Sequence, residues 1–320
     1  MTTSATGPTP VTGVGSVPLP HGVSRRAFLG FCSTMAAALA LPVGEIARAV
    51  AAAPRLPVVW IATQDCTADT ESLLRSVDPG ISALLLDVIS LDYHETLMAP
   101  AGARAGQALD AALDRGGYVC VVEGAIPTAS NGVHCLIDGE TGLSLVRRAT
   151  AGALFTLAVG SCAVDGGIAA AAPNPTGATG VSGAVSGIAN LVNLPGCPVN
   201  GVNLVATIVY YLTHTTLPPL DSSRRPTFAY GQRIHAAGAC DRYEFFRAGQ
   251  YVLAWGDEGH RKGWCLRRMG CAGPRTFANC HTRNWNETSW PIGAGHPCVG
   301  CTVSRFWDGN TPFYVRKPGN

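Results

Sequence analysis

Charged side chains are scarce in this chain of 320 residues: they make up 14% of it, and the formal net charge is only +2. They form no basic stripe, which argues against a nucleic acid as a partner. Low charge combined with many Gly and Ala residues indicates that a large part of the surface is buried against another protein. Ala- and Gly-rich α/β domains are also common, and that is the alternative explanation of the same composition.

Several motifs that would define a self-contained active site are missing. There is no P-loop, no dinucleotide-binding fingerprint and no Ser-His-Asp set worth defending. There is no internal repeat, and the Ala-rich tract near the N-terminus is the one low-complexity segment. Residues 313–320 are polar, and no apolar run near them is long enough to span a bilayer. We therefore expect any membrane contact to be made through a partner or through the N-terminal segment.

Cysteine, in contrast, is abundant, with twelve residues. In a small secreted protein this number would predict a disulfide framework. This chain is long enough to bury a core without such cross-links, and five of its cysteines follow one another at short spacings: Cys265, Cys271, Cys280, Cys298 and Cys301. Short spacings favour metal ligation over long-range bridges. Zinc is the ordinary alternative for a set of Cys and His ligands.

The N-terminal segment has the pattern of an export signal. Residues 24–30 read SRRAFLG, an apolar run follows from Phe31 to Val43, and Ala47-Arg48-Ala49 has the small-x-small pattern of a cleavage site. This resembles a twin-arginine signal, whose route carries folded, cofactor-loaded proteins. We expect residues 1–53 to be a leader and the protein to reach the periplasmic side or cell envelope. The alternative is an uncleaved helix on a cytoplasmic protein.

The rest of the first two thirds alternates between apolar strands and helices. We expect strands at 57–62, 81–89, 118–123, 153–159 and 191–194, and helices from 71 to 77, 105 to 114, 143 to 150 and 203 to 214. Strands that are apolar throughout and alternate with helices predict a parallel sheet covered on both faces. Beyond about residue 216 this periodicity fades. The sequence predicts an α/β domain at 54–217 and a loop-rich domain at 218–320 that metal ligation stabilises.

Three cysteines come directly after predicted strands. Cys66 follows the first strand, Cys162 the fourth and Cys197 the fifth. Loops at the carboxyl ends of parallel strands converge at one edge of a sheet, so these thiols are expected to meet. Asp69 lies three residues after Cys66, and a thiol and a carboxylate at that spacing can bind one metal centre from a single turn. The pattern indicates a protein that moves electrons.

Longer motifs that are typical of one protein family follow one another in order over nearly all of residues 57–308. They are 60–72, 89–95 (ISLDYHE), 123–127 (EGAIP), 174–177 (NPTG), 195–198 (PGCP), 225–231 (RPTFAYG) and 295–298 (GHPC). On these motifs the chain closely resembles the small subunit of nickel–iron hydrogenases. The resemblance implies a flavodoxin-like domain followed by a loop-rich iron–sulfur domain. It also implies a large subunit as partner, which holds the nickel–iron site that splits dihydrogen.

The resemblance implies three clusters along one path for electrons. A proximal [4Fe-4S] cluster would be held by Cys66, Asp69, Cys162 and Cys197, and a distal [4Fe-4S] cluster by His235, Cys240, Cys265 and Cys271. A medial [3Fe-4S] cluster would be held by Cys280, Cys298 and Cys301, with Pro291 at the position of a missing fourth ligand. The chain would relay electrons from dihydrogen oxidation to an acceptor that the sequence does not identify. It leaves open whether the heterodimers assemble further.

Two positions depart from the family pattern. Most relatives have Cys where this chain has Asp69, and an aspartate there resembles the actinobacterial-type, high-affinity, oxygen-insensitive subgroup. Ala68 and Gly167 stand where another, oxygen-tolerant subgroup has extra cysteines, which argues against a six-cysteine cluster. Four residues separate His235 from Cys240, where most relatives have two. The alternative for Asp69 is that it is not a ligand and that another group completes the site. The alternative for His235 is a purely structural role.

Three cysteines are left over. Cys32 lies in the leader, Cys120 in the middle of a predicted strand, and Cys135 is expected, like Cys120, to be a small core residue. Two rival functions remain. One is a module like the cluster-bearing subunit of respiratory complex I, against which the motifs in 235–301 argue. The other is a zinc-stabilised or disulfide-bonded binding protein without redox activity, which iron content and colour would distinguish.

Overall fold

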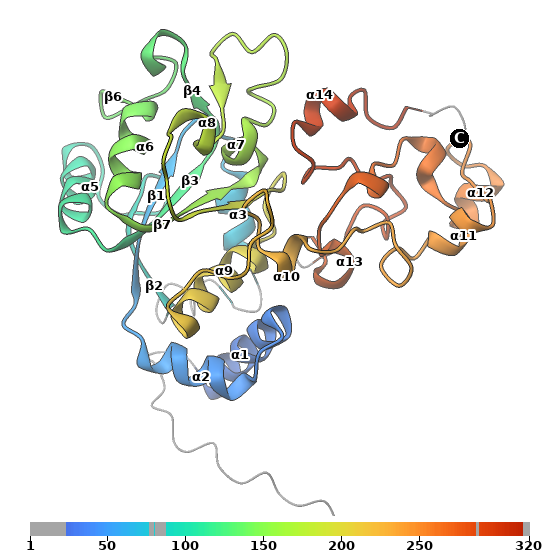
Figure 1. The fold of residues 1–320 in the computed structure, drawn as a ribbon, viewed down its shortest axis with the longest axis horizontal. Coiled ribbons are helices and arrows are strands. Elements are labelled where there is room, and N and C mark those ends of the chain that lie inside the picture. The colour runs from blue at the N-terminus through green and yellow to red at the C-terminus, as the bar shows by residue number, and fades with distance from the viewer. Residues whose placement is uncertain (1–23, 77–79, 81–87, 286–287, 316–320) are drawn as a thin grey trace, which may run out of the picture.

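The computed structural model describes residues 24–76, 80, 88–285 and 288–315. They form an α/β part around one central sheet and a C-terminal part made of loops and very short helices, side by side in Figure 1. Two further helices lie beneath the α/β part in that view.

The central sheet has five parallel strands. In chain order they are β1 (Leu56–Ala62), β2 (Ile89–His94), β3 (Tyr118–Glu123), β7 (Ala153–Val159) and β9 (Leu191–Leu194). They lie in the order β2-β1-β3-β7-β9, and each pairs with its neighbours in parallel. Numbered along the chain this is the order 2-1-3-4-5 of flavodoxin-like folds. The predicted α/β fold with a parallel sheet is confirmed.

Four of the five predicted strands agree closely with β1, β3, β7 and β9. The strand predicted at 81–89 falls largely on residues 81–87, which lie outside the described residues. The described strand β2 begins at Ile89, where that prediction ends, and runs to His94. Polar residues alternate with apolar ones along β2, so the strand does not stand out as an apolar run.

Helices cover both faces of the sheet. Helix α9 (Gly201–His214) and the shorter α3 (Ala68–Leu74) pack on one face, where Trp60, Val121 and Leu157 point. Helices α5 (Ala103–Arg115) and α6 (Gly142–Ala151) pack on the other face, where alternate strand residues such as Ile61 and Val122 point. All six residues of β3 are buried, as expected for the central strand of a sheet with two covered faces.

Short elements fill the loops around the sheet. They are β4 (Ile126–Pro127), the 3₁₀ turn η2 (Ala129–Gly132), β5 (Leu136–Ile137), β6 (Glu140–Thr141), α7 (Gly160–Asp165), β8 (Ala178–Thr179) and α8 (Val181–Ala184). Strand β4 pairs with β8, and β5 with β6, each in an antiparallel two-stranded sheet.

The segment predicted as a leader is folded onto this domain. It forms α1 (Arg25–Leu39) and α2 (Val43–Ala52), which contact each other and α9. Phe31, Met35 and Ile46 are buried in the same core as α9. No single described helix is long and apolar enough to cross a membrane; α1 and α2 reach that length and hydropathy only together, and they are bent by 119° where they meet.

The C-terminal part contains little regular structure. Its helices are α10 (Thr227–Tyr230), α11 (Tyr243–Arg247), α12 (Glu258–Arg261), α13 (Cys280–Arg283) and α14 (Phe306–Asn310), with 3₁₀ turns η3 (Leu266–Met269) and η4 (Gly273–Arg275). Its core cluster includes Cys240, Cys271 and Cys298 among a few apolar residues such as Trp290. Cysteines therefore occupy positions that aliphatic side chains fill in an ordinary core.

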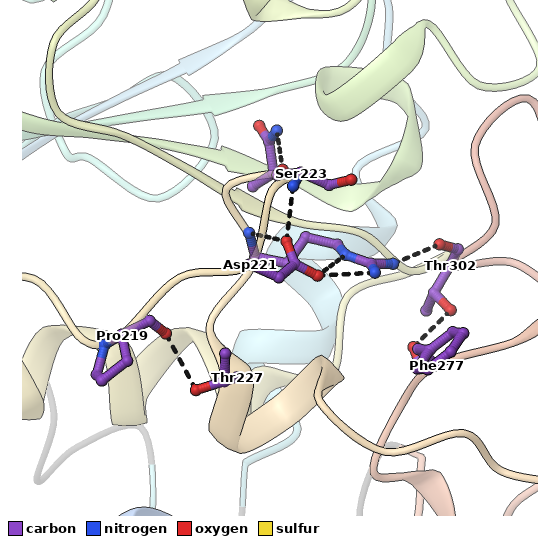
Figure 2. A network of polar contacts seen from close by, with 8 residues as sticks. Pro219, Asp221, Ser223, Thr227, Phe277 and Thr302 are labelled. Atoms are coloured by element: carbon purple, nitrogen blue, oxygen red, sulfur yellow. Dashed lines mark hydrogen bonds and ion pairs between the residues drawn. The ribbon is translucent and has the colours of Figure 1, made fainter.

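A polar network links residues 221–225 to Phe277 and Thr302 (Figure 2). The Asp221 carboxylate accepts hydrogen bonds from the Arg225 guanidinium and from backbone N–H groups, including that of Ser223. The other end of the guanidinium donates to the backbone oxygen of Thr302, at 3.4 Å. The Thr302 hydroxyl donates in turn to the backbone oxygen of Phe277. This network holds the segment after α9 against the loops of the C-terminal part.

Candidate metal centres

The first candidate set gathers at the carboxyl edge of the sheet. Cys66 follows β1, Cys162 lies in α7 after β7, and Cys197 follows β9. Burial, followed by the charges of Cys197, Asp69 and Cys66, raises the pKa of the Cys162 thiol to about 12. The four groups therefore lie near enough for their charges to act on one another. The edge predicted from strand order therefore brings all four predicted proximal ligands together.

Asp69 is fixed from two sides. It lies in the first turn of α3, and its Oδ1 accepts a hydrogen bond of 2.6 Å from the Val199 backbone N–H. A Cβ atom placed on Gly160 would lie 2.0 Å from Oδ2, so the carboxylate fills the space that a side chain would need. Burial raises the pKa of Asp69 to about 8, although the bond from Val199 acts in the opposite direction. A nearby cation or metal would restore the charged form.

The second set lies in the C-terminal part. Burial raises the pKa of the Cys265 thiol to about 11, with additional contributions from the charges of Cys271 and Cys240. A Cβ atom on Gly273 would lie 3.3 Å from the Cys271 Sγ and 3.6 Å from the His235 Cβ, which places these two residues side by side. The structure therefore brings together the four predicted distal ligands.

The His235 ring packs against aromatic side chains, and one of its ring nitrogens has no hydrogen-bond partner. Its centroid lies 4.5 Å from that of Phe246 and 5.2 Å from that of Tyr243, both edge-on. The Nε2 atom is buried and has no hydrogen-bond partner. Burial, followed by the charges of Arg267 and Arg233, lowers the pKa of His235, which favours the neutral imidazole that binds metals. A buried nitrogen without a partner fits a ligand position.

The third set, Cys280, Cys298 and Cys301, lies between the other two. Burial, followed by the charge of Cys298, raises the pKa of the Cys280 thiol to about 12. The pKa of the Cys301 thiol is raised to about 12 by burial and by the charge of Cys280. The thiols of these three cysteines therefore lie near one another.

Contacts between the sets fix their order. A backbone hydrogen bond from Cys197 and the charge of that residue both act on the Cys301 thiol. At the other end, the Cys298 backbone N–H donates to the Cys271 Sγ at 3.4 Å. The first set therefore adjoins the third, and the third adjoins the second. The eleven side chains form one row that starts at the sheet edge and ends among α11 and α12.

The chemistry of the donors fits iron–sulfur clusters. All twelve cysteines are free thiols. Within the described ranges, no three Cys, His, Asp or Glu side chains approach closely enough to hold a single metal ion. A tetrahedral zinc site needs that close approach. Ligands of a cluster bind different irons and stand farther apart, with the inorganic core between them.

The remaining cysteines lie away from the row. Cys120 is fully buried in the middle of β3, which confirms its expected place in the core. Cys32 is fully buried on α1. The Cys135 side chain is half-buried and packs near Gly142 at the start of α6.

Some groups around the first set were not predicted from the sequence. The Ser161 hydroxyl donates to the Cys301 backbone oxygen at 2.5 Å and accepts from the Gly196 N–H, so it joins the segments of three ligands. Thr70 and His94 lie behind Asp69 in a buried hydrogen-bonded chain with Glu123. The sequence had one usable signal: Glu123 ends a strand at the same sheet edge as the cysteines.

The fold and the row of ligands together define an iron–sulfur electron-transfer protein. Comparison with known proteins gives the family. The family model for the C-terminal region of the NiFe/NiFeSe hydrogenase small subunit matches residues 230–314, and that for the NADH ubiquinone oxidoreductase 20 kDa subunit matches 66–211. The second match reflects the shared α/β domain, and the first separates this chain from the complex I rival.

Individual relatives agree. The chain is 45% identical over 299 residues to the periplasmic [NiFe] hydrogenase small subunit 1 of Nitratidesulfovibrio vulgaris, covering 92% of this chain and 94% of that protein. It is 43% identical to the hydrogenase-2 small chain of Escherichia coli, covering 91% and 79%.

Solved structures give the same result. The [NiFeSe] hydrogenase of Desulfomicrobium baculatum matches with a TM-score of 0.76 at 34% identity, covering 83% of this chain and 100% of that one. The actinobacterial-type NiFe hydrogenase of Ralstonia eutropha H16 matches with a TM-score of 0.75 at 26% identity, covering 84% of both. The chain belongs to the family of NiFe hydrogenase small subunits. These are the electron-transfer subunits of heterodimers whose active site lies in the large subunit.

Proposed function

We propose that the row of eleven side chains holds three clusters between the large subunit and an external acceptor. The first set would hold a proximal [4Fe-4S] cluster, the third a medial [3Fe-4S] cluster and the second a distal [4Fe-4S] cluster. The observation that carries this proposal is the order of the sets, fixed by the contacts of Cys197 with Cys301 and of Cys298 with Cys271. Residues 54–217 would then carry the proximal cluster and residues 218–320 the other two.

Asp69 would bind iron through Oδ2. The Val199 N–H donates to Oδ1, and Gly160 leaves room for Oδ2. An oxygen ligand is harder than a thiolate and is more easily exchanged or protonated. Asp69 would therefore tune the cluster that lies nearest the partner's catalytic site.

His235 would complete the distal set through Nε2, since that atom is buried without another partner. A neutral imidazole in place of a thiolate removes negative charge and raises the potential of a cluster. The medial set has three thiols. Pro291 stands where a fourth cysteine could, and its backbone oxygen accepts from the His296 N–H, two residues before Cys298. Three ligands favour a three-iron cluster.

When bound, such clusters carry single electrons at potentials of about −700 to +450 mV, set by cluster type, charge, hydrogen bonds and exposure. The protein's own groups supply the placement. The Ser161 hydroxyl ties the Cys301 segment to the loop that carries Cys197, and so keeps two sets adjacent. Burial of Cys271 and Cys298 keeps water away from the inner part of the row.

The end of the row at the sheet edge would face the large subunit. Cys66 and Cys197 are exposed there, and Ile168 beside Cys162 is 56% exposed. Because two proposed ligands would otherwise be open to water, we take this edge as the surface that the large subunit covers. Dihydrogen oxidation in the partner would release electrons at this end, and the acceptor would collect them at the other end.

The test is to purify the chain anaerobically together with the chain that binds it. We expect a brown heterodimer with about eleven irons in the small subunit, from two four-iron clusters and one three-iron cluster, and dihydrogen-dependent reduction of a dye. Zinc, or the absence of acid-labile sulfide, would contradict the proposal.

Asp69→Cys tests the aspartate ligand, because redox-titrated EPR should then show a changed proximal signal. An unchanged signal would mean that Asp69 is a bystander.

For location, we propose export by the twin-arginine route together with the large subunit. Arg25 and Arg26 are exposed at the start of α1, where a receptor can reach them. The alternative is a cytoplasmic protein that keeps the segment, and the burial of Ala47 within α2 favours retention. Cell fractionation and sequencing of the mature N-terminus distinguish the two.

Oxygen insensitivity, as in the actinobacterial-type subgroup, predicts that dye reduction persists in air.

A further inference from the structure

A buried carboxylate lies directly behind Asp69. Glu123, the last residue of β3, is 1% exposed. Its Oε1 accepts hydrogen bonds from the backbone N–H groups of Asp69 (3.0 Å) and Thr70 (3.2 Å). Its Oε2 accepts from the Trp60 indole (3.0 Å) and the Thr70 hydroxyl (2.5 Å). Four donors around one buried charge compensate for its loss of water.

These contacts supply a cap that helix α3 lacks. The residue at its N-cap position, Thr67, has a left-handed backbone with φ 61°, and its side chain makes no capping hydrogen bond. The second and third residues of a helix, here Asp69 and Thr70, have N–H groups that an N-cap side chain normally satisfies. Glu123 accepts both of them from a different strand. A carboxylate at this end is also favoured by the helix dipole.

The cap is itself held in place from the far side. The Thr96 backbone N–H donates to the His94 Nδ1, so the proton of the neutral ring lies on Nε2, which donates to the Thr70 hydroxyl at 3.1 Å. The Thr70 hydroxyl then donates to Glu123. His94, Thr70 and Glu123 thus form one directed chain, buried throughout, that ends on the first turn of α3.

We propose that Glu123 is the positioning residue for Asp69, and that it holds the first turn of α3 so that the Asp69 carboxylate faces the thiols of the proximal set. The backbone N–H of Asp69 is bound by Glu123 at one end of the residue, and its Oδ1 is bound by the Val199 N–H at the other. Without the first contact only the second remains to orient the side chain. This inference rests on the proposed ligation of iron by Asp69.

The experiment is Glu123→Gln in the purified heterodimer, with EPR-monitored redox titration and iron analysis. An amide has one acceptor oxygen where the carboxylate has two, and its NH₂ group would face donors that need an acceptor. We expect Asp69 to leave the cluster, the proximal site to lose about one iron, and a second three-iron signal to appear, as three remaining thiols favour. The medial and distal signals should stay unchanged. Glu71→Gln is the matched control, because Glu71 lies on the same helix, is exposed and pairs only with Arg75 among the ion pairs of the described residues.

The outcomes separate this inference from the proposed function. A wild-type heterodimer without a proximal signal would contradict the function itself. A wild-type signal that Glu123→Gln leaves unchanged in shape and potential would overturn the positioning role alone. If Glu123→Gln yields no folded protein, Thr70→Val decides, since it removes one of the four donors. We expect Thr70→Val to change the proximal midpoint potential while the other two potentials remain, and an unchanged proximal potential would overturn the inference.

Discussion

Gly160 shows how a single hydrogen atom in place of a side chain makes room for a ligand. It directly follows β7 with a positive φ of 77°, and any Cβ there would meet the Asp69 carboxylate from 2.0 Å away. Because the clash involves all three carboxylate atoms, the side chain could not avoid it by rotating slightly. The site therefore requires glycine at position 160 as well as the aspartate at position 69.

We predict that Gly160→Ala displaces Asp69 and changes or removes the proximal EPR signal while the medial and distal signals persist. The matched control is Gly187→Ala: Gly187 has nearly the same φ, 78°, but has no atom within 4 Å of the added carbon. Both variants carry the same backbone strain, of order 1–2 kcal/mol. Equal proximal signals in the two variants would contradict the proposed contact.

His94 makes a pH-dependent contribution to stability. Burial lowers its pKa from 6.5 to about 4. The unfolded chain therefore binds more protons than the folded one between these values. The stability that His94 contributes is complete above about pH 6.5 and is lost as the pH falls toward 4.

We predict that His94→Gln destabilises the heterodimer by about 1 to 3 kcal/mol at pH 7.5, because the Thr70 hydroxyl loses its buried hydrogen bond from the imidazole. The difference between the thermal midpoints of wild type and variant should then narrow as the pH is lowered from 6.5 to 5. All other titrating groups are common to both proteins and cancel. A difference that stays constant from pH 7.5 to 5 would show that the imidazole does not titrate in this range.

Among the elements, α1 and α2 behave as part of the domain. Their apolar faces lie in the same core as α9, and the Ala47-Arg48-Ala49 motif lies inside helix α2 with Ala47 only 4% exposed. Proteases cut exposed, poorly ordered segments, so cleavage here requires α2 to come away and unfold first. The sequence showed the motif but could not show that it would be covered.

We predict that Met35→Ala lowers the unfolding free energy of the full-length chain by about 2–5 kcal/mol, the usual result of a cavity in a core. Met35 is fully buried, whereas Leu29 on the same helix is 49% exposed, so Leu29→Ala is the control and should have little effect. Denaturant unfolding of the heterodimer measures both. Equal stability of all three full-length proteins would contradict the packing of Met35 in the core that α1 shares with α9.

At the scale of the whole molecule, the two parts differ in what stabilises them. The α/β part has two apolar cores on the faces of its sheet. The C-terminal part has one small core in which several members are the proposed ligands. Helices of three to five residues add little to it, because isolated short helices are not stable in water. Its stability should therefore depend on iron.

We predict that anaerobic removal of iron by a chelator increases hydrogen exchange throughout residues 231–315, while the amides of β3 and β7 remain protected. Mass spectrometry of the heterodimer before and after chelation measures both regions in one experiment. Uniform loss of protection would show that the sheet needs the clusters as well. Unchanged protection at 231–315 would contradict the stabilising role of the ligands.

The sequence by itself determined the sheet and the identity of the family. Apolar runs of four to seven residues that alternate with helical segments permit few arrangements, and β3, β7 and β9 were located almost to the residue. It could not give the strand at 89–94, whose polar residues break the apolar run. The strand that it predicted at 81–89 falls largely on residues 81–87, which lie outside the described residues. The sequence also grouped the candidate ligands, because each cysteine of the first set follows a strand.

Only the tertiary structure decided how those ligands stand together. Contacts between residues 197 and 301, and between 298 and 271, bring distant parts of the chain into one row, and no local pattern encodes such pairs. The same holds for Glu123, which caps a helix more than fifty residues before it. It holds also for α9, which packs against the N-terminal helices α1 and α2. Local propensity acts over a few residues, whereas a buried charge or an apolar face finds its partner only when the whole chain has folded.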